Sequence, residues 1–313
     1  MTRLALLACV GAIAALVATT LPAQATAPGV DGRIAFASDR SGPGTQNLFS
    51  IRPDGTGLTQ LTNFTADQGA ASEPSWSPDG TAIVFTLASD NFSTFRIWIM
   101  NGDGSNAHEL VAGSGRADFQ ASFSPDGSRV LFRGCPPNRE LCNVYTVKTD
   151  GHGLTTLTHN NGTGKGDVFD VKPEYSPDGS TISFSSFNRG GVQNGVYLMG
   201  PRGQNIRLIT PTALEAVDAD WAPDGSRLAF WGPCCVSGTD TLWTIRPDGT
   251  GLTQLTDGSD GNDIRPSYAP AGDRIAFERF GDGSSSIYTM PAGGGTPSLL
   301  VSDAAWPSWG PAE

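Results

Sequence analysis

The chain has 313 residues, of which 40 are glycine and 22 proline; 16% are charged, and the formal net charge is −11. Abundant glycine and proline with few charges are typical of many short strands joined by turns. Such an acidic chain argues against nucleic acid or an anionic membrane surface as the main partner.

Residues 1–25 are predicted to be a secretory signal peptide outside the fold. Arg3 provides a basic start, residues 4–18 are apolar, and Ala23-Gln24-Ala25 is a small-x-small cleavage site. The apolar stretch is shorter than the roughly 18–20 residues that span a bilayer. Cleavage is expected after Ala25 or Ala27, with a retained anchor or lipoprotein as the alternative. No later run is long enough to span a membrane, so the mature chain is predicted to be soluble and either periplasmic or extracellular.

A short motif recurs through the rest of the chain and predicts a strand that ends on an aromatic residue and then turns. Its copies are Trp76-Ser-Pro-Asp-Gly80, Phe123-Ser-Pro-Asp-Gly127, Tyr175-Ser-Pro-Asp-Gly179, Trp221-Ala-Pro-Asp-Gly225, Tyr268-Ala-Pro-Ala-Gly272 and the partial Trp309-Gly-Pro311. The prolines at the third position are separated by 47, 52, 46, 47 and 41 residues. A period in the forties with fixed turn residues indicates propeller blades.

Each period contains four predicted strands. In the second period, the first strand is 73–76, followed by Ala82–Phe85, Phe95–Met100 and Ala107–Val111. The second strands are rich in β-branched and aromatic residues, as strands usually are. The segment Ile51–Thr62 recurs identically at Ile245–Thr256, which indicates duplication.

The two ends of the chain predict how the ring closes. The first strand after the leader, Arg33–Phe36, corresponds to a second strand, and the last, Ala305–Trp309, corresponds to a first strand. Pairing them completes a sixth blade and removes open strand edges. Residues 26–313 are therefore predicted to form one all-β domain, a six-bladed β-propeller closed by its C-terminal strand.

On these residues, the chain resembles the TolB-like β-propellers, a WD-repeat-like family with Pro-Asp-Gly repeats. Pro74-Ser-Trp-Ser-Pro-Asp-Gly80 and the strands that follow match the blade of that family, and the resemblance covers nearly all of residues 30–311. It implies the propeller fold. The extra N-terminal domain of the founding member and the C-terminal hydrolase domain of the peptidase relatives are expected to be absent, so the roles of those domains do not carry over.

The predicted loops form two sets on opposite faces of the ring. The Ser-Pro-Asp-Gly and Asp-Gly-x-Gly turns are nearly uniform. The other loops vary in length and composition, and they lie at 38–46, 63–71, 133–142, 159–168, 185–194, 231–240 and 257–263. Irregular loops on a rigid scaffold usually carry binding. We therefore predict that the ligand binds this variable-loop face and the adjoining channel mouth.

Acidic residues recur just before the predicted innermost strands. Asp118, Asp170 and Asp263 each lie five residues before the blade aromatic, and Asp218 lies close to the same position. Because Ca²⁺ takes about six to eight oxygen ligands, the first three are candidate metal ligands, and all four are candidate ligand-binding residues. Alternatively, each satisfies backbone N–H groups at a strand entry. Trp231, as a stacking contact, and His159, the one histidine on this face, complete the candidate site.

Four cysteines follow the leader and allow three connectivities. Cys135 and Cys142 flank one loop, and a disulfide between them is expected in an exported protein. Cys234 and Cys235 are adjacent, so a bridge between them would be strained. Their state stays open, as a free pair could also reach another chain.

The sequence favours a binding protein over an enzyme. It has no Gly-x-Ser-x-Gly nucleophile elbow, no Ser/His/Asp set on a supporting fold, and only three histidines. We predict a secreted, monomeric, non-catalytic propeller that needs no cofactor and binds a protein, peptide or glycan of the cell envelope. The alternative is a metal-dependent lyase, lactonase or hydrolase with a carboxylate-rich site at the channel mouth, for which Ca²⁺ is the candidate ion.

Overall fold

The computed structural model describes residues 29–42, 45–137, 141–160, 168–233, 239–281 and 283–312. Within these ranges the secondary structure is β, with two short 3-10 turns, η1 (Arg189–Gly191) and η2 (Thr212–Leu214), and no α-helix. The predicted signal peptide, Cys234, Cys235 and parts of four variable loops lie outside the described residues.

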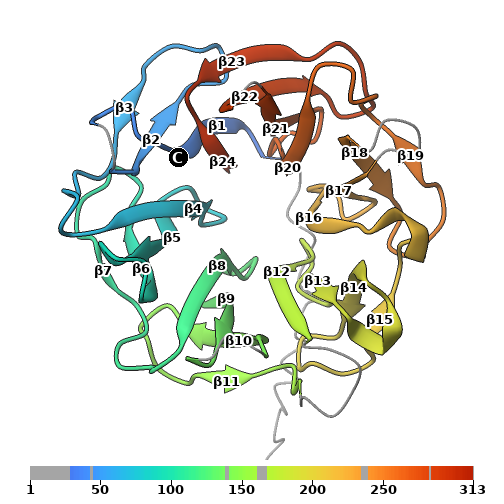
Figure 1. Ribbon diagram of the computed structural model, residues 1–313, viewed down its shortest axis with the longest axis horizontal. Helices are drawn as coiled ribbons and strands as arrows, with labels where there is room; N and C mark the ends of the chain where they lie inside the picture. Colours follow the sequence, from blue (N-terminus) through green and yellow to red (C-terminus); the bar gives the residue numbers. More distant parts are fainter. Residues whose placement is uncertain are drawn as a thin grey trace, which may run out of the picture.

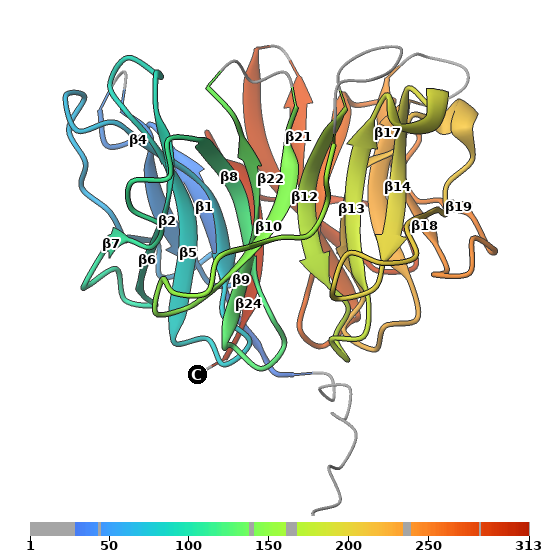
Figure 2. The same cartoon turned by 90° about the horizontal axis from the view of Figure 1, so that it is seen from below.

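Six four-stranded antiparallel sheets surround a central axis as the blades of a propeller (Figures 1 and 2). From the innermost strand outwards, blade 1 contains β24 (Ala305–Pro311), β1 (Asp31–Ser38), β2 (Asn47–Ile51) and β3 (Thr59–Gln60). Blade 2 contains β4 (Ala70–Trp76), β5 (Ala82–Ala88), β6 (Phe95–Asn101) and β7 (His108–Glu109). Blade 3 contains β8 (Ala117–Phe123), β9 (Arg129–Cys135), β10 (Asn143–Lys148) and β11 (Thr155–Thr156). Blade 4 contains β12 (Phe169–Tyr175), β13 (Ile182–Phe187), β14 (Asn194–Met199) and β15 (Arg207–Leu208). Blade 5 contains β16 (Val217–Trp221), β17 (Leu228–Pro233), β18 (Asp240–Ile245) and β19 (Thr253–Gln254). Blade 6 contains β20 (Asn262–Tyr268), β21 (Arg274–Gly281), β22 (Ser284–Pro291) and β23 (Ser298–Ser302). The predicted six-bladed propeller is confirmed.

Blade 1 joins segments from the two ends of the chain. β24 pairs antiparallel with β1, placing Trp309 opposite Ile34 and Ser308 opposite Ala35. Figure 1 shows the red β24 against the blue β1 at the inner edge of this blade. The predicted closure by the C-terminal strand is therefore confirmed.

Phenylalanine at the same position of every second strand fills the space between blades. These six side chains are fully buried, and they are Phe36, Phe85, Phe132, Phe184, Phe230 and Phe277. Four of them lie against an aromatic of the neighbouring third strand, with ring centroids 5.6–6.0 Å apart. Burial of each side chain contributes roughly 1.5–3 kcal/mol. This repeated core makes the ring a rigid frame for whatever lines its channel.

The Ser-Pro-Asp-Gly turns owe their uniformity to a local hydrogen-bond pattern. In the first copy, the Ser77 hydroxyl donates to Asp79 (2.6 Å), which also accepts the Thr81 amide (3.1 Å). These bonds hold the pKa of Asp79 below its ordinary value, and the bond from the Ser77 hydroxyl has the largest effect. Gly80 completes the turn at φ 72°, a conformation that glycine adopts without strain. Such turns close blades and leave few groups for recognition.

Every innermost strand carries a β-bulge at the same place, three residues before the blade aromatic. In blade 2, Ser72 pairs with Thr86 and Ser75 with Val84, so two residues of β4 face one of β5. The first of the two bulged residues has a left-handed φ of 48–59° in all six blades, at Glu73, Gln120, Lys172, Asp218, Arg265 and Trp306. Bulges re-aim side chains, and here they turn one residue per blade towards the axis.

Candidate functional site: a ring of side chains in the central channel

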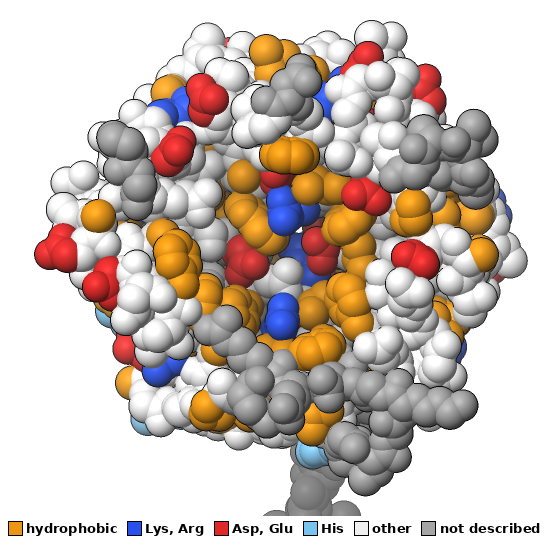
Figure 3. Space-filling view, in the orientation of Figure 1, with side chains coloured by type: hydrophobic (Ala, Val, Ile, Leu, Met, Phe, Trp, Pro, Cys, Tyr) orange, Lys and Arg blue, Asp and Glu red, His pale blue; other side chains and the backbone are white. Residues whose placement is uncertain are grey.

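The six bulge residues line the channel together, and we call them the bulge ring. They are Glu73, Gln120, Lys172, Asp218, Arg265 and Trp306. The cavity between them is only about 30 Å³, so their side chains nearly close the channel at this level. Viewed from the variable-loop face, acidic and basic side chains lie at the centre of a mostly apolar rim (Figure 3).

Hydrogen bonds tie ring positions to one another across blade boundaries. The Glu73 carboxylate accepts the Gln120 amide N–H (3.0 Å), and the Gln120 side-chain oxygen accepts that of Lys172 (3.1 Å). In the same way, the amides of Asp218 and Trp306 donate to Ser185 and Glu278 of the preceding blade, at 2.8 and 3.1 Å. The backbone of these four bulge residues is thus held by the preceding blade.

Arg265 and Trp306 form a cation–π pair within the ring. The guanidinium carbon lies 3.4 Å from the centroid of the Trp306 ring. Glu278 orients the arginine through an ion pair of 2.8 Å. Such a pair presents an apolar face and a positive charge side by side.

A second channel cavity, of about 210 Å³, lies on the turn side of the ring, and Lys172, Glu174 and Asp220 line it. The carboxyl groups of Glu174 and Asp220 influence each other's pKa. Burial, followed by the charge of Asp220, raises the pKa of Glu174 well above its ordinary value, and burial raises the pKa of Asp220 to about 6. Burial opposes the charge of Lys172, but the carboxylates of Glu174, Asp220, Asp218 and Glu73 outweigh it and raise its pKa. The pair therefore binds a proton more tightly than ordinary carboxyl groups do, beside a lysine whose charge it stabilises.

Three of the predicted site residues, Asp118, Asp170 and Asp263, line neither channel cavity. Each is fully buried in a different blade and forms an ion pair with an arginine, at 3.1 Å to Arg116, 2.7 Å to Arg189 and 2.6 Å to Arg279. Within the described ranges, no group of three or more His, Cys, Asp or Glu residues could hold a metal ion. A Ca²⁺ site stays a prediction, and each of these aspartates has a guanidinium group as its ion-pair partner.

The structure brings Asp218 and Trp231 together at the ring. The indole Nε1–H of Trp231 donates to the Asp218 carboxylate at 3.2 Å. Trp231 belongs to β17, so the loop that we predicted to start there starts later, because β17 continues pairing through Pro233. His159 is exposed and lines neither channel cavity.

The predicted disulfide between Cys135 and Cys142 is confirmed. The Arg133 guanidinium contacts both sulfurs, at 3.1 and 3.3 Å. The carbonyl of Cys142 accepts the amide of Asp170 in the next blade at 3.2 Å. The bridge joins two residues of blade 3, and the hydrogen bond of Cys142 connects them to the first strand of blade 4.

Comparisons with known proteins identify the fold. No family model matches the chain. A TolB homolog from Chlorobium luteolum is 30% identical over 155 residues, which span 49% of this chain and 32% of that protein. An uncharacterized protein from Agrobacterium fabrum is 27% identical over 155 residues, spanning 45% of this chain and 48% of its own length. Thus the match covers about a third and about half of these relatives.

The crystal structure of TolB from Acinetobacter baumannii superimposes with a TM-score of 0.71 and 20% identity, over 90% of this chain and 67% of that one. The fold is therefore a β-propeller similar to that of TolB. No helix in the described part of this propeller is long and apolar enough to cross a membrane.

Sequence reasoning overlooked most of the ring of this propeller. Strand alternation predicts that residues five, three and one positions before the aromatic share one face. The bulge interrupts that alternation, so the channel is lined at the third and first positions, as with Lys172 and Glu174, and not at the fifth. One sequence signal could have revealed the ring. The position three residues before the blade aromatic holds six different residue types, each followed by a proline or an alanine.

Proposed function

We propose that this chain is an exported, non-catalytic propeller that binds a protein or peptide of the cell envelope through its variable-loop face, with the bulge ring at the centre of the contact. One observation carries the proposal: a single backbone position, at the same φ in six blades, holds six different residue types. The core phenylalanines beside it are identical in all blades. The fold therefore requires the bulge but not the variety of its side chains.

The chemistry of the ring favours a polypeptide over a glycan. Around the axis, Glu73 and Asp218 alternate with Lys172 and Arg265, and the Trp306 face lies beside them. A polypeptide can supply charges of both signs and apolar groups, whereas a neutral glycan would leave the charges unpaired. Near the same face, a hollow of about 430 Å³ is bordered by Phe92, which is 60% exposed. Exposed aromatics of this kind are common at protein interfaces.

The experiment is affinity capture from the envelope fraction and medium of the source organism, with Lys172→Gln compared to wild type by quantitative mass spectrometry. Lys148→Gln is the matched control, since Lys148 is exposed at the end of β10 on the turn face. We expect partners that Lys172→Gln loses and Lys148→Gln retains. Partners lost equally with both variants, or with neither, would contradict a ring-centred interface. Glycan arrays probed with the same proteins test the glycan alternative.

A further inference from the structure

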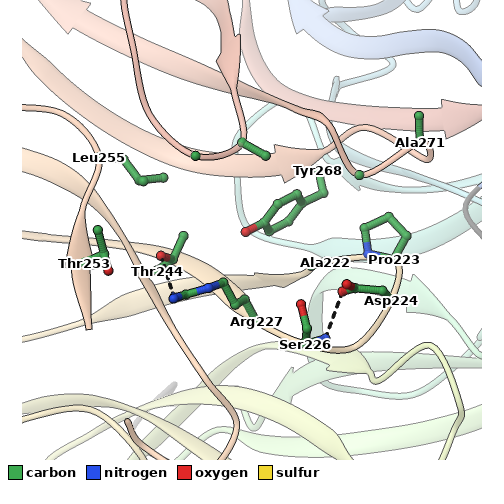
Figure 4. Close-up of a pocket in the computed structure, with 13 residues that line it drawn as sticks. Ala222, Pro223, Asp224, Ser226, Arg227, Thr244, Thr253, Leu255, Tyr268 and Ala271 are labelled. Carbon is green, nitrogen blue, oxygen red and sulfur yellow. Dashed lines mark hydrogen bonds between the residues drawn. The ribbon is translucent and has the colours of Figure 1, made fainter. Parts of the chain in front are cut away.

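A pocket of about 370 Å³ lies between blades 5 and 6 on the turn face, away from the bulge ring (Figure 4). Blade 5 contributes Pro223, Arg227 and Leu255, and blade 6 contributes Tyr268 and Ala292. The volume is at the lower end of the range for small-molecule sites, which bury most of the ligand among apolar walls and a few polar groups.

Blade 6 departs from the repeat at two positions beside this pocket. Ala271 stands where the other complete turns place Asp79, Asp126, Asp178 and Asp224. Gly293 stands where the turns after four other third strands place Asp54, Asp103, Asp150 and Asp248, and where that of blade 4 places Arg202. Both Ala271 and Gly293 line the pocket. Blade 6 therefore lacks, beside this pocket, two negative charges that most of the other blades carry at the same positions.

Tyr268 supplies a polar group that the fold does not use. The residue is 7% exposed, and the part of the chain that the structure describes gives its hydroxyl no hydrogen-bond partner. Figure 4 shows this hydroxyl pointing into the space between Leu255, Thr244 and Arg227. Burial raises the pKa of Tyr268, so the hydroxyl keeps its proton and can donate. The hydroxyl faces the open pocket, so it can donate to water or to a ligand there.

Arg227 places a positive charge on the opposite wall. Its Nη1 donates to the Thr244 hydroxyl at 3.1 Å and to the Gly251 carbonyl at 2.9 Å, which fixes the guanidinium. Asp224 lies at the exposed rim, where it accepts the Ser226 amide at 2.9 Å. A fixed guanidinium and a tyrosine hydroxyl on facing walls match an acceptor with two oxygens.

We propose that this inter-blade pocket binds a small carboxylate with an apolar body, its oxygens held by Tyr268 and Arg227 and its body against Leu255 and Ala292. The site is independent of the variable-loop face. It lies among the turns that close the blades, beside the two blade 6 positions that carry Ala271 and Gly293 in place of aspartate.

The test is titration calorimetry and saturation-transfer NMR with benzoate, phenylacetate and isobutyrate, and with benzamide as the neutral counterpart of benzoate. We expect saturable binding of at least one carboxylate and weaker binding of benzamide. Tyr268→Phe is expected to weaken carboxylate binding roughly tenfold, since it removes a hydrogen bond to a charged group. Its melting temperature should stay unchanged, because the substitution breaks no hydrogen bond among the described residues. Tyr288→Phe, in the same blade but outside the pocket, is the matched control.

A second variant guards against an indirect effect of the tyrosine. Gly293 has open space around its Cβ position, so Gly293→Phe is expected to fold and to block the pocket. The proposal is overturned if none of the carboxylates binds saturably, if benzamide binds as well as benzoate, or if Tyr268→Phe and Tyr288→Phe behave alike. Binding that survives Gly293→Phe would also overturn it.

Discussion

Glu174 and Asp220 couple the stability of the propeller to pH. A carboxyl group whose pKa is higher in the folded chain than in the unfolded chain binds its proton more tightly when folded. The stabilisation is complete below the ordinary carboxyl pKa of about 4, and it is lost as the pH rises through the folded value. For Asp220 that value is about 6. The pair therefore favours the folded state in mild acid and opposes it at neutral pH.

Asp220→Asn is expected to stabilise the protein at pH 7.5–8 (about one to two units above the folded pKa). The asparagine oxygen can still accept the Tyr268 amide, which donates to Asp220 at 2.7 Å, and the variant carries no charge to bury. The expected gain is on the order of 1–2 kcal/mol, allowing for water in the channel, and it disappears near pH 4. Denaturant unfolding across this range measures it. Asp90→Asn, at an exposed turn, is the control, and a gain that is equal at both pH values would contradict the assignment.

Calcium is expected to have little effect on the described fold. Asp118, Asp170 and Asp263 each already have an arginine within 3.1 Å, so a cation at any of them would have to displace a guanidinium. We expect the melting temperature to be the same in Ca²⁺ and in EDTA. A clear upward shift in Ca²⁺ would instead support the metal-dependent alternative and would locate a site that these ion pairs do not explain.

At the scale of the structural elements, the ion pairs of Asp118, Asp170 and Asp263 with arginine connect strands and loops at the variable-loop end of a blade. Asp170 accepts hydrogen bonds from Arg189 (2.7 Å), Ser186 (2.6 Å) and Asn160 (2.8 Å). The guanidinium carbon of Arg189 also lies within 5.8 Å of the ring centroids of Phe184 and Tyr197. The ion pair of Asp170 and Arg189 thus belongs to a hydrogen-bonded group that joins the first strand, the second strand and the loop that arrives from the preceding blade.

Arg189→Ala is expected to destabilise the protein by about 3 kcal/mol, because it leaves the fully buried Asp170 charge without its ion-pair partner. Arg202→Ala, at an exposed position, should change stability by less than about 0.5 kcal/mol. Chemical denaturation measures both. Adding Asp170→Asn to Arg189→Ala should recover part of the loss; if it recovers nothing, the loss comes from the packing of Arg189 and not from the unpaired charge.

The elements also show what the sequence could and could not predict. Turns and second strands repeat at fixed offsets, so their chemistry appears in the sequence itself, as at Ser77 and Asp79. The bulges depend on pairing between strands, and neither glutamate at position 73 nor lysine at position 172 is a residue type that indicates a left-handed φ. The two members of an ion pair can lie well apart in the chain, as Asp170 and Arg189 do, 19 residues apart. Spacing alone therefore does not show which arginine pairs with which aspartate.

At the scale of the whole molecule, the ring depends on one strand contributed from far along the chain. A chain that ends at Ala304 lacks β24 and exposes the inner edge of β1. We expect it to aggregate and to lose cooperative unfolding, as open strand edges pair with other chains. Size-exclusion chromatography and thermal unfolding measure this. A chain that ends at Pro311 keeps β24 and serves as the control; similar behaviour of the two would mean that five complete blades suffice.

The pairing of β1 with β24 also sets an order of events during synthesis. Ile34 pairs with Trp309, a residue that leaves the ribosome 275 positions later. At roughly 5–20 residues per second, that delay is about 15–55 s. The first strand made is therefore the last to find its inner partner, and until then the nascent chain carries an unpaired β edge. Exposure to aggregation is fixed by the rate of translation as much as by the free energy of the finished ring.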